Sequence, residues 1–273
     1  MKKHSLPLRF LLLLALAAVG VTMLAPFVWQ VGTSLKPLSE LDNGSFWPRH
    51  WRPDNYRQVL DQIPYVRYYL NSLVVAASVT LLQVLTSATA GYAFSRLHWR
   101  GRDKVFLAYL ATMMVPGVVT LIPNFALMWK LHLYDTYAGL ILPSAFGAFG
   151  TFLIRQFMLG IPASLNESAR IDGATEWQTF WEIIFPLARP ALATLAIFTF
   201  MGNYSSFLWP LIMVKGEGLR TLPLGLMFFD SSHGVQTNLL MAASAMAIVP
   251  LVIVFLLFQR QIIAGLQSGA VKG

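Results

Sequence analysis

Six long stretches of the chain contain no Asp, Glu, Lys or Arg, and short charged segments separate them. Their residues are continuously apolar rather than alternately apolar and polar, which favours membrane helices over the strands of a β-barrel. A helix needs about 20 mostly apolar residues to cross a bilayer core of about 30 Å, and it satisfies its own backbone hydrogen bonds in lipid. The pattern therefore predicts an all-α integral membrane protein with six transmembrane helices in a single domain over residues 1–273. We place these spans at about residues 10–32, 69–94, 105–128, 137–156, 190–214 and 237–259.

The composition supports this class of protein. Of the 273 residues, 56% are hydrophobic and 12% are charged, whereas a soluble domain carries about 25% charged residues. The absence of cysteine excludes disulfides, thiolate metal sites and cysteine nucleophiles. For the first apolar stretch, which follows Lys2, Lys3 and Arg9, a cleaved signal peptide is the alternative. That stretch is longer than the roughly 7–15 residues of a signal core, so we expect an uncleaved anchor.

The charges between the predicted spans indicate an orientation. If the N-terminus is cytoplasmic, six spans return the C-terminal tail, residues 260–273, to the cytoplasm, and 12 of the 20 Lys and Arg residues lie on that side. Cytoplasmic loops are enriched in basic residues, so this distribution favours cytoplasmic N- and C-termini. The densest basic group consists of Arg96, Arg100, Arg102 and Lys104. We interpret it as a topology signal, because no aromatic-interleaved basic surface suggests nucleic-acid binding.

The apolar stretches hold neutral polar residues but no carboxylate. An ion-coupled secondary transporter usually places an ionisable group inside the membrane, so we expect the energy source to lie in another subunit. Asn71, Asn124 and Asn203 are candidates for lining a transport path, and Pro116 and Pro123 predict a kinked third span. Hydrogen bonding between helices is the alternative role for each amide.

The longest predicted cytoplasmic loop, residues 160–187, carries signals for two short helices. Ser164 with Glu167, and Thr175 with Gln178, have the spacing of capping boxes. Gly173 between them suits a helix stop in the left-handed conformation. On the second helix, one face is apolar and largely aromatic, and it consists of Trp177, Phe180, Trp181 and Ile184. We expect this face to fit a groove.

Part of this loop resembles a known motif. Glu167-Ser168-Ala169, Asp172-Gly173-Ala174, Phe180, Ile183 and Pro186 are similar to the Glu-Ala-Ala loop of the membrane subunits of bacterial ABC importers, with Ser168 in place of Ala. The resemblance implies the type I ABC importer permease fold, in which this loop is a coupling helix that docks into a cleft of the cytoplasmic ATPase. It implies a coupling role for Glu167, Ala169, Arg170, Asp172, Gly173, Trp177, Phe180 and Pro186.

Other segments resemble the carbohydrate-uptake branch, in particular the smaller, maltose-permease-type membrane subunit. They are residues 33–37, 71–72, 92–102, 136–143 and 264–273. One departure lies before Phe207-Leu208-Trp209-Pro210, where members of the family commonly show Trp-Asn and this chain has Tyr204-Ser205. Tyr204 and Ser205 join the three asparagines as candidate path-lining residues.

The resemblance implies a permease subunit of an ATP-driven sugar or oligosaccharide importer in the bacterial inner membrane. The implied partners are a second homologous permease, two ATPase subunits and an extracytoplasmic sugar-binding protein. ATP and Mg would bind the ATPases only, and the chain contains no Gly-Lys dipeptide and hence no Walker A loop. We expect no enzyme activity, no cofactor and no metal site. The alternatives are an importer of glycerol phosphate or a polyol, a stand-alone secondary transporter, and a membrane-embedded enzyme.

Overall fold

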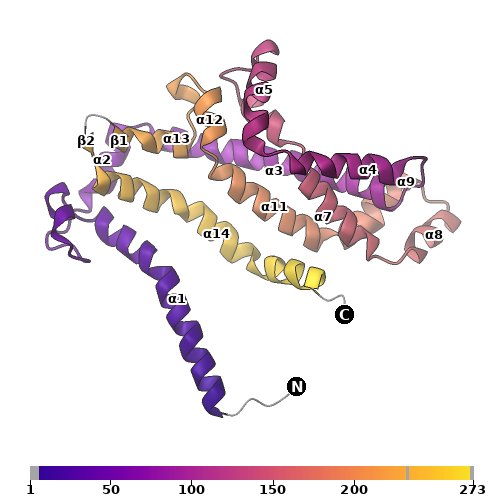
Figure 1. The fold of residues 1–273 in the computed structure, drawn as a ribbon, viewed down its shortest axis with the longest axis horizontal. Coiled ribbons are helices and arrows are strands. Elements are labelled where there is room, and N and C mark those ends of the chain that lie inside the picture. Colours follow the sequence, from indigo (N-terminus) through magenta and orange to yellow (C-terminus); the bar gives the residue numbers. More distant parts are fainter. Residues whose placement is uncertain (1–5, 232–233, 271–273) are drawn as a thin grey trace. The chain divides into compact units, whose positions relative to one another are not determined.

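The computed structural model of the protein describes residues 6–231 and 234–270. The chain divides into two compact units, one of residues 1–66 and 225–249 and the other of residues 67–224 and 250–273. The helices are labelled in Figure 1. Within the described ranges, the only strands are β1 (Asp230–Ser231) and β2 (Gly234–Val235), which pair antiparallel. The predicted all-α class is confirmed by this structure.

In the first unit, polar contacts fix the segment that follows the first helix. This unit contains α1 (Leu6–Ser34), a 3₁₀ turn (Leu38–Asn43), α2 (Asp54–Gln62) and the start of α14 (Thr237–Ala270). The side-chain amide of Asn55 donates to the carbonyl oxygens of Ser34 and Lys36, each at 2.8 Å. Carbonyls at a helix C-terminus lack partners within the helix, so Asn55 satisfies the end of α1 and ties α2 to it.

The second unit holds the remaining helices. They are α3 (Tyr65–Ser95, from Arg67 onward), α4 (Arg102–Ala111), α5 (Gly117–Lys130), α6 (Tyr137–Ile141), α7 (Ala148–Leu159), α8 (Ser164–Ile171), α9 (Glu176–Gln178), α10 (Phe185–Leu187), α11 (Arg189–Tyr204) and α12 (Leu208–Met213). A π-helical turn, Thr179–Ile184, joins α9 to α10. Short 3₁₀ turns lie at Thr112–Met114, Leu142–Ser144 and Glu217–Leu219. α13 (Leu222–Leu226) begins in this unit and ends in the first, to which the 3₁₀ turn Met227–Phe229 belongs.

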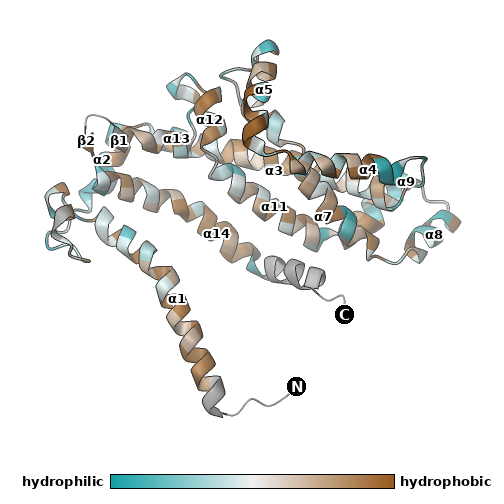
Figure 2. Cartoon of the chain, viewed as in Figure 1, coloured by the Kyte–Doolittle hydropathy of each residue, from teal (hydrophilic) through white to brown (hydrophobic). Residues whose placement is uncertain are grey.

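Three of the predicted spans are continuous helices. Among the described residues, α1, α3 and α14 are each long and apolar enough to cross a membrane. Three bent helix pairs bring the number to six if each pair counts as one span. Hydrophobic residues run along the helices, whereas hydrophilic residues gather around α8 and α9 and at the adjoining end of α4 (Figure 2). This division matches the apolar stretches and charged loops of the sequence.

The third span is broken rather than kinked. The helical segments Arg102–Met114 and Gly117–Lys130 meet at 100°. Val115 before Pro116 has an extended backbone, with φ −82° and ψ 117°, because a residue that precedes proline is disfavoured in the helical region. Pro123, in contrast, lies inside α5. Pro116 therefore ends one helix and Pro123 is accommodated within the next.

The fifth predicted span, residues 190–214, is also not one helix. α11 ends at Tyr204 and α12 begins at Leu208, with Ser205 at the break. At its other end, α11 meets the helical segment Glu176–Leu187 at 74°. The fourth span bends by 45° between Ser144 and Ala148. The apolar stretches therefore predict where these helical segments lie in the sequence, but they do not predict where the helices are interrupted.

Two apolar clusters form the core of the second unit. One joins α3, α7, α11 and the π-helical turn through Ala88, Ile154, Met158, Phe180, Ile184 and Leu195, among others. The other joins α3, α5, α6 and α12 through Val75, Val79, Met128, Leu140 and Met213. Gly139 lies beside the second cluster, where a Cβ atom would stand 2.1 Å from the Leu133 carbonyl oxygen and 2.6 Å from Met213 Cε. Only glycine fits there without a shift of the backbone.

We therefore predict that Gly139→Ala destabilises the protein by about 1–3 kcal/mol, the usual cost of overpacking. Gly202→Ala is the matched control, because its new Cβ would meet no atom within 4 Å and alanine favours the helix by up to about 1 kcal/mol. Thermal unfolding of the purified chain in detergent measures both variants. Equal midpoints for the two variants would contradict this packing.

Candidate coupling surface

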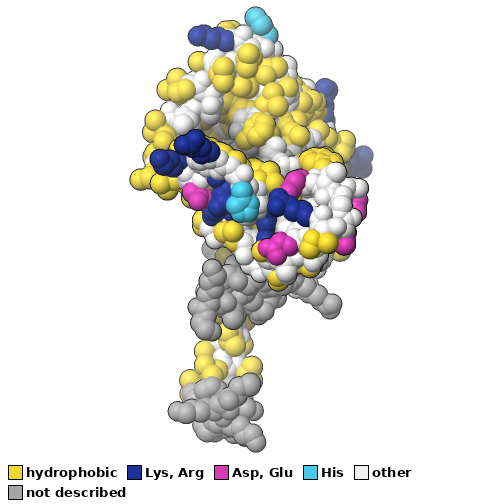
Figure 3. Space-filling model, turned by 90° about the vertical axis from the view of Figure 1, so that its right-hand side faces the viewer, with side chains coloured by type: hydrophobic (Ala, Val, Ile, Leu, Met, Phe, Trp, Pro, Cys, Tyr) yellow, Lys and Arg dark blue, Asp and Glu magenta, His cyan; other side chains and the backbone are white. Residues whose placement is uncertain are grey.

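The predicted coupling loop, residues 160–187, forms α8, a tight turn, α9, the π-helical turn and α10. These elements lie at one end of the second unit, next to the start of α4 (Figure 1). Viewed from that end, side chains of Lys, Arg, Asp, Glu and His lie close together among exposed hydrophobic ones (Figure 3). This end of the second unit therefore presents a mixed charged and apolar face.

α8 ends in the turn that the sequence predicts. Gly173 has φ 82°, in the left-handed region. Its N–H donates to the Arg170 carbonyl oxygen at 3.1 Å, and the N–H of Ala174 donates to that of Ala169 at 2.9 Å. This pair of bonds is a Schellman motif, which satisfies the last carbonyls of α8 and requires a residue that tolerates positive φ. At the other end the prediction was wrong: Ala163, not Ser164, is the N-cap, and no side chain caps the helix.

The second helix starts at the predicted capping box. Thr175 Oγ1 accepts from the N–H of Gln178 at 3.3 Å, and Gln178 Oε1 accepts from the N–H of Thr175 at 2.9 Å. The helix then widens into the π-helical turn before Pro186. Proline lacks the N–H that an α-helical bond to Glu182 needs, which is a physical reason for the wider turn at this place.

The apolar face of this second helix packs mostly on the chain itself. Phe180 is 2% exposed and Ile184 is fully buried, both in the cluster shared with α3, α7 and α11. The ring centroids of Phe180 and Tyr92 are 5.1 Å apart. Trp177 alone of this face is well exposed, at 64%. The expectation that the whole face fits a partner's groove is therefore corrected: the face holds the loop to the bundle.

A polar network beside this contact joins the two short helices to α3. One carboxylate oxygen of Glu176 accepts from the Tyr92 hydroxyl at 2.7 Å. The other accepts from Arg170 Nε at 3.1 Å and also from the second guanidinium nitrogen. This hydrogen bond raises the pKa of Arg170 above its ordinary value. Glu176 thereby connects α8, α9 and α3 at one point.

Five of the exposed residues of the loop form the candidate coupling surface, which we define as Glu167, Arg170, Ile171, Asp172 and Trp177. All five are exposed, and Ile171 is 86% exposed. Gly173 is also exposed, whereas Pro186 is half-buried and Ala169 is buried. An aliphatic and an aromatic side chain beside three charges are typical of a protein-binding surface.

Sequence reasoning missed two residues of this site and proposed others that lie elsewhere in the structure. Ile171 stands out in the sequence only as the apolar last residue of a largely polar helix. Tyr92 lies 84 residues before its partner Glu176, so no local sequence pattern relates these two residues. Among the described residues, no cluster of three or more His, Cys, Asp or Glu side chains is suited to hold a metal ion.

Asn71 belongs to a buried network. Its side-chain amide donates to the carbonyl oxygens of Gly218 at 3.0 Å and Arg220 at 2.8 Å, and its carbonyl accepts from the Tyr137 hydroxyl at 2.5 Å. An asparagine with these three partners fixes the segment after α12 to α3. The structure therefore gives Asn71 a structural role within this chain.

The other predicted path-lining residues lie on two helices. Asn203, Tyr204 and Ser205 are consecutive at the end of α11, and Asn124 is half-buried on α5. The amide of Asn203 donates to the Thr199 carbonyl oxygen at 2.8 Å, within the same helix. Tyr204 is buried and stacks on Phe200, with ring centroids 5.9 Å apart. Ser205 is exposed at the break between α11 and α12.

Residues 83–267, which include the coupling loop, match the family of binding-protein-dependent transport system inner membrane components. The chain belongs to this family. It is thus a multi-pass inner-membrane permease subunit, a component of a transport system rather than an enzyme, as the sequence predicted. The family's name states that its transport depends on a binding protein.

Individual relatives support this assignment over the full length. The arabinooligosaccharides transport system permease protein AraQ of Halalkalibacterium halodurans is 36% identical, with all of both chains aligned. The trehalose transport system permease protein SugB of Mycobacterium tuberculosis is 33% identical over 93% of this chain and 94% of its own. A subunit of a bacterial ABC transporter for alginate has the same fold, with a TM-score of 0.84, 24% identity, and 95% of this chain and 99% of that chain covered. The predicted permease fold is confirmed.

We predict that Tyr92→Phe loosens the second helix. It removes a hydrogen bond to a carboxylate, which contributes about 1.5–3 kcal/mol. Exchange of the hydrogen-bonded amides of Thr175, Gln178 and Thr179 should therefore accelerate by roughly ten- to a hundredfold. Tyr109→Phe is the control, because among the described residues no hydrogen bond is found for its hydroxyl. Unchanged exchange in Tyr92→Phe would show that Glu176 does not hold the loop to α3.

Proposed function

We propose that the chain forms half of the translocation path of an ATP-driven importer of a neutral sugar or oligosaccharide. Its partners in this proposal are a second homologous permease, two ATPase subunits and an extracytoplasmic sugar-binding protein. ATP and Mg bind the ATPases, and both termini of the chain face the cytoplasm of a bacterial cell. The observation that carries the proposal is full-length similarity to oligosaccharide permeases, together with an exposed coupling surface on a loop anchored in the core.

Similarity to relatives supports the substrate class. The names of the relatives give their cargoes as arabinooligosaccharides, trehalose, lactose and diacetylchitobiose, which are all oligosaccharides. The six apolar stretches contain no Lys or Arg, and an anionic cargo such as glycerol phosphate is bound better by a path with a basic group. The composition of the spans therefore favours a neutral cargo.

Residues at the break after α11 are the best-supported candidates for the path. Asn203, Tyr204 and Ser205 lie where the helix is interrupted, and an interruption at membrane depth is tolerated where it is covered by protein or lines a water-filled cavity. Asn124 on α5, the second half of the broken third span, is a further candidate. Asn71 in this proposal positions the segment near Gly218 rather than the cargo.

The packing of the loop supports a coupling mechanism. Closure of the ATPases on ATP displaces their clefts, in which the coupling surface sits. Because Phe180 and Ile184 are buried against α3, α7 and α11, displacement of the surface moves those helices rather than only the loop. A closely packed core transmits such a movement, and alternating access of the path follows from it.

Gly173 provides a test of this coupling. A β-branched residue at positive φ costs about 1–2 kcal/mol, so Gly173→Val should lower the equilibrium constant for forming the native turn by roughly five- to thirtyfold. Sugar uptake per ATP hydrolysed should fall as the turn opens. Gly173→Asn is the matched control, because asparagine tolerates this backbone and a Cβ atom meets nothing within 4 Å. Uptake and ATP hydrolysis are measured together on the complete importer in proteoliposomes.

The same proteoliposomes test the function and the cargo. We expect ATP-dependent uptake of a neutral oligosaccharide that requires the binding protein. Uptake of glycerol phosphate in preference to sugars would contradict the proposed substrate class. Transport by the chain without ATPase subunits would contradict the proposal that it belongs to an ATP-driven importer. Wild-type coupling in Gly173→Val would remove the role of the turn while leaving the importer in place.

A further inference from the structure

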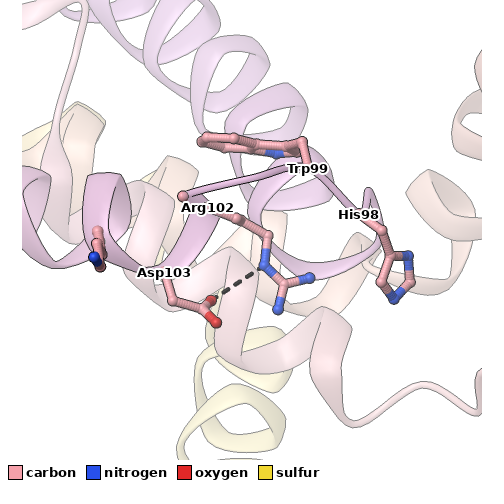
Figure 4. A pocket seen from close by; sticks show the side chains of 6 residues that line it. His98, Trp99, Arg102 and Asp103 are labelled. Atoms are coloured by element: carbon pink, nitrogen blue, oxygen red, sulfur yellow. Dashed lines mark hydrogen bonds and ion pairs between the residues drawn. The ribbon is translucent and has the colours of Figure 1, made fainter.

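A hollow of about 270 Å³ lies where α3 ends and α4 begins. It is lined by His98, Trp99, Gly101, Arg102, Asp103 and Lys104. Figure 4 shows His98, Trp99, Arg102 and Asp103 around it, with the side chains of Arg102 and Asp103 directed toward each other. The hollow is outside the coupling surface defined above, and the proposed transport function assigns it no role.

The charges around the hollow leave an excess of cations. The single carboxylate, that of Asp103, is shared between Arg102 Nε at 3.1 Å and Arg155 at 3.4 Å. Arg102 also donates to the Leu97 carbonyl oxygen at 3.2 Å, so it is fixed by the fold. Lys104 and the neighbouring Arg100 are exposed, and neither has an ion pair within residues 6–231 and 234–270. Both remain able to bind an anion.

Aromatic and apolar side chains border the same place. Trp99 is partly exposed and lies against Phe94, with ring centroids 5.8 Å apart, and Phe94 packs on Phe106 at 5.3 Å. One turn further along α4, Leu107 is 68% exposed. Tryptophan concentrates at the headgroup level of membranes, between water and hydrocarbon. The hollow therefore lies at the boundary where a basic end meets an apolar helix surface.

We propose that this hollow binds the phosphate of an anionic phospholipid headgroup, with Lys104 as its exposed lining cation and Trp99 beside the glycerol region. Arg100, an exposed cation of the same loop outside the lining, adds attraction for the headgroup. Basic pockets at the cytoplasmic ends of membrane helices bind such headgroups, and the charge distribution of the chain predicts this end to be cytoplasmic. A bound lipid stabilises the corner between α3 and α4. Arg155 on α7 contacts both sides of this corner, because its Nε donates to the Phe94 carbonyl oxygen of α3 and its guanidinium lies over the Phe106 ring of α4.

The absence of cysteine allows a fluorophore to be placed next to the hollow. We label Leu107→Cys in the complete importer and measure its quenching by lipids whose headgroups carry a spin label, comparing phosphatidylglycerol with phosphatidylcholine in nanodiscs. We expect clear preference for the anionic lipid. Each cation near the surface strengthens binding by about fivefold, so the double variant Arg100→Gln with Lys104→Gln should lose roughly 25-fold of that preference.

Lys130→Gln is the matched control, because Lys130 is an exposed cation beside an exposed tryptophan, Trp129, outside the hollow. It should keep the lipid preference. Excess inorganic phosphate distinguishes a site for a lipid headgroup from a site for free phosphate. If the site binds lipid, the preference for the anionic lipid should persist when phosphate is added. Equal quenching by both lipids in the parent protein, an unchanged preference in the double variant, or loss of the preference on adding phosphate would each overturn the proposal.

Discussion

The proposed coupling depends on the burial of Phe180 and Ile184 against α3, α7 and α11, because this packing fixes the loop to those helices. A loop bound to the bundle only at its two ends would absorb a push by bending. This loop is also held in its middle by two core side chains and by the Glu176 carboxylate, which bonds both Tyr92 and Arg170. The residues that face outward, Ile171 and Trp177 above all, therefore stand on a support continuous with the helices of the second unit.

The division between buried and exposed residues gives the motif a physical explanation. Gly173 adopts the left-handed backbone conformation that reverses the chain after α8. Ala169 is small enough to be buried beside this turn, whereas Arg170, Ile171 and Asp172 stay exposed. In the proposed coupling, removing the side chain of Phe180 would therefore act on transmission within the chain, whereas altering the exposed Ile171 would act on association with the ATPase.

The sequence was sufficient for those features that depend on local chemistry. The apolar runs predicted helices long and apolar enough to cross a membrane, because every backbone group in lipid must be satisfied within its own segment, and three of them are continuous among the described residues. The turn at Gly173 and the cap at Thr175 follow from residues a few positions apart. The broken spans did not follow in this way. Pro26, Pro123 and Pro250 all lie inside helices, whereas Pro116 separates two helices that meet at 100°. Tertiary packing therefore decides whether a proline interrupts its helix.

Helical periodicity likewise identified the aromatic face that includes Phe180. Periodicity does not show whether such a face is buried by the same chain or by a partner. Asn71 shows the same limit, since its partners near Gly218 are 147 residues away.

The proposed coupling requires that Ile171 contacts the ATPase while the loop stays fixed to its own chain. Site-directed cross-linking in the assembled importer tests it directly, with a single cysteine at Ile171 and a second variant with the cysteine at Leu38, an exposed aliphatic residue of the first unit. We expect Ile171→Cys to cross-link to the ATPase subunit and Leu38→Cys not to do so. Absence of any cross-link from Ile171→Cys in the ATP-bound and ATP-free importer would contradict it.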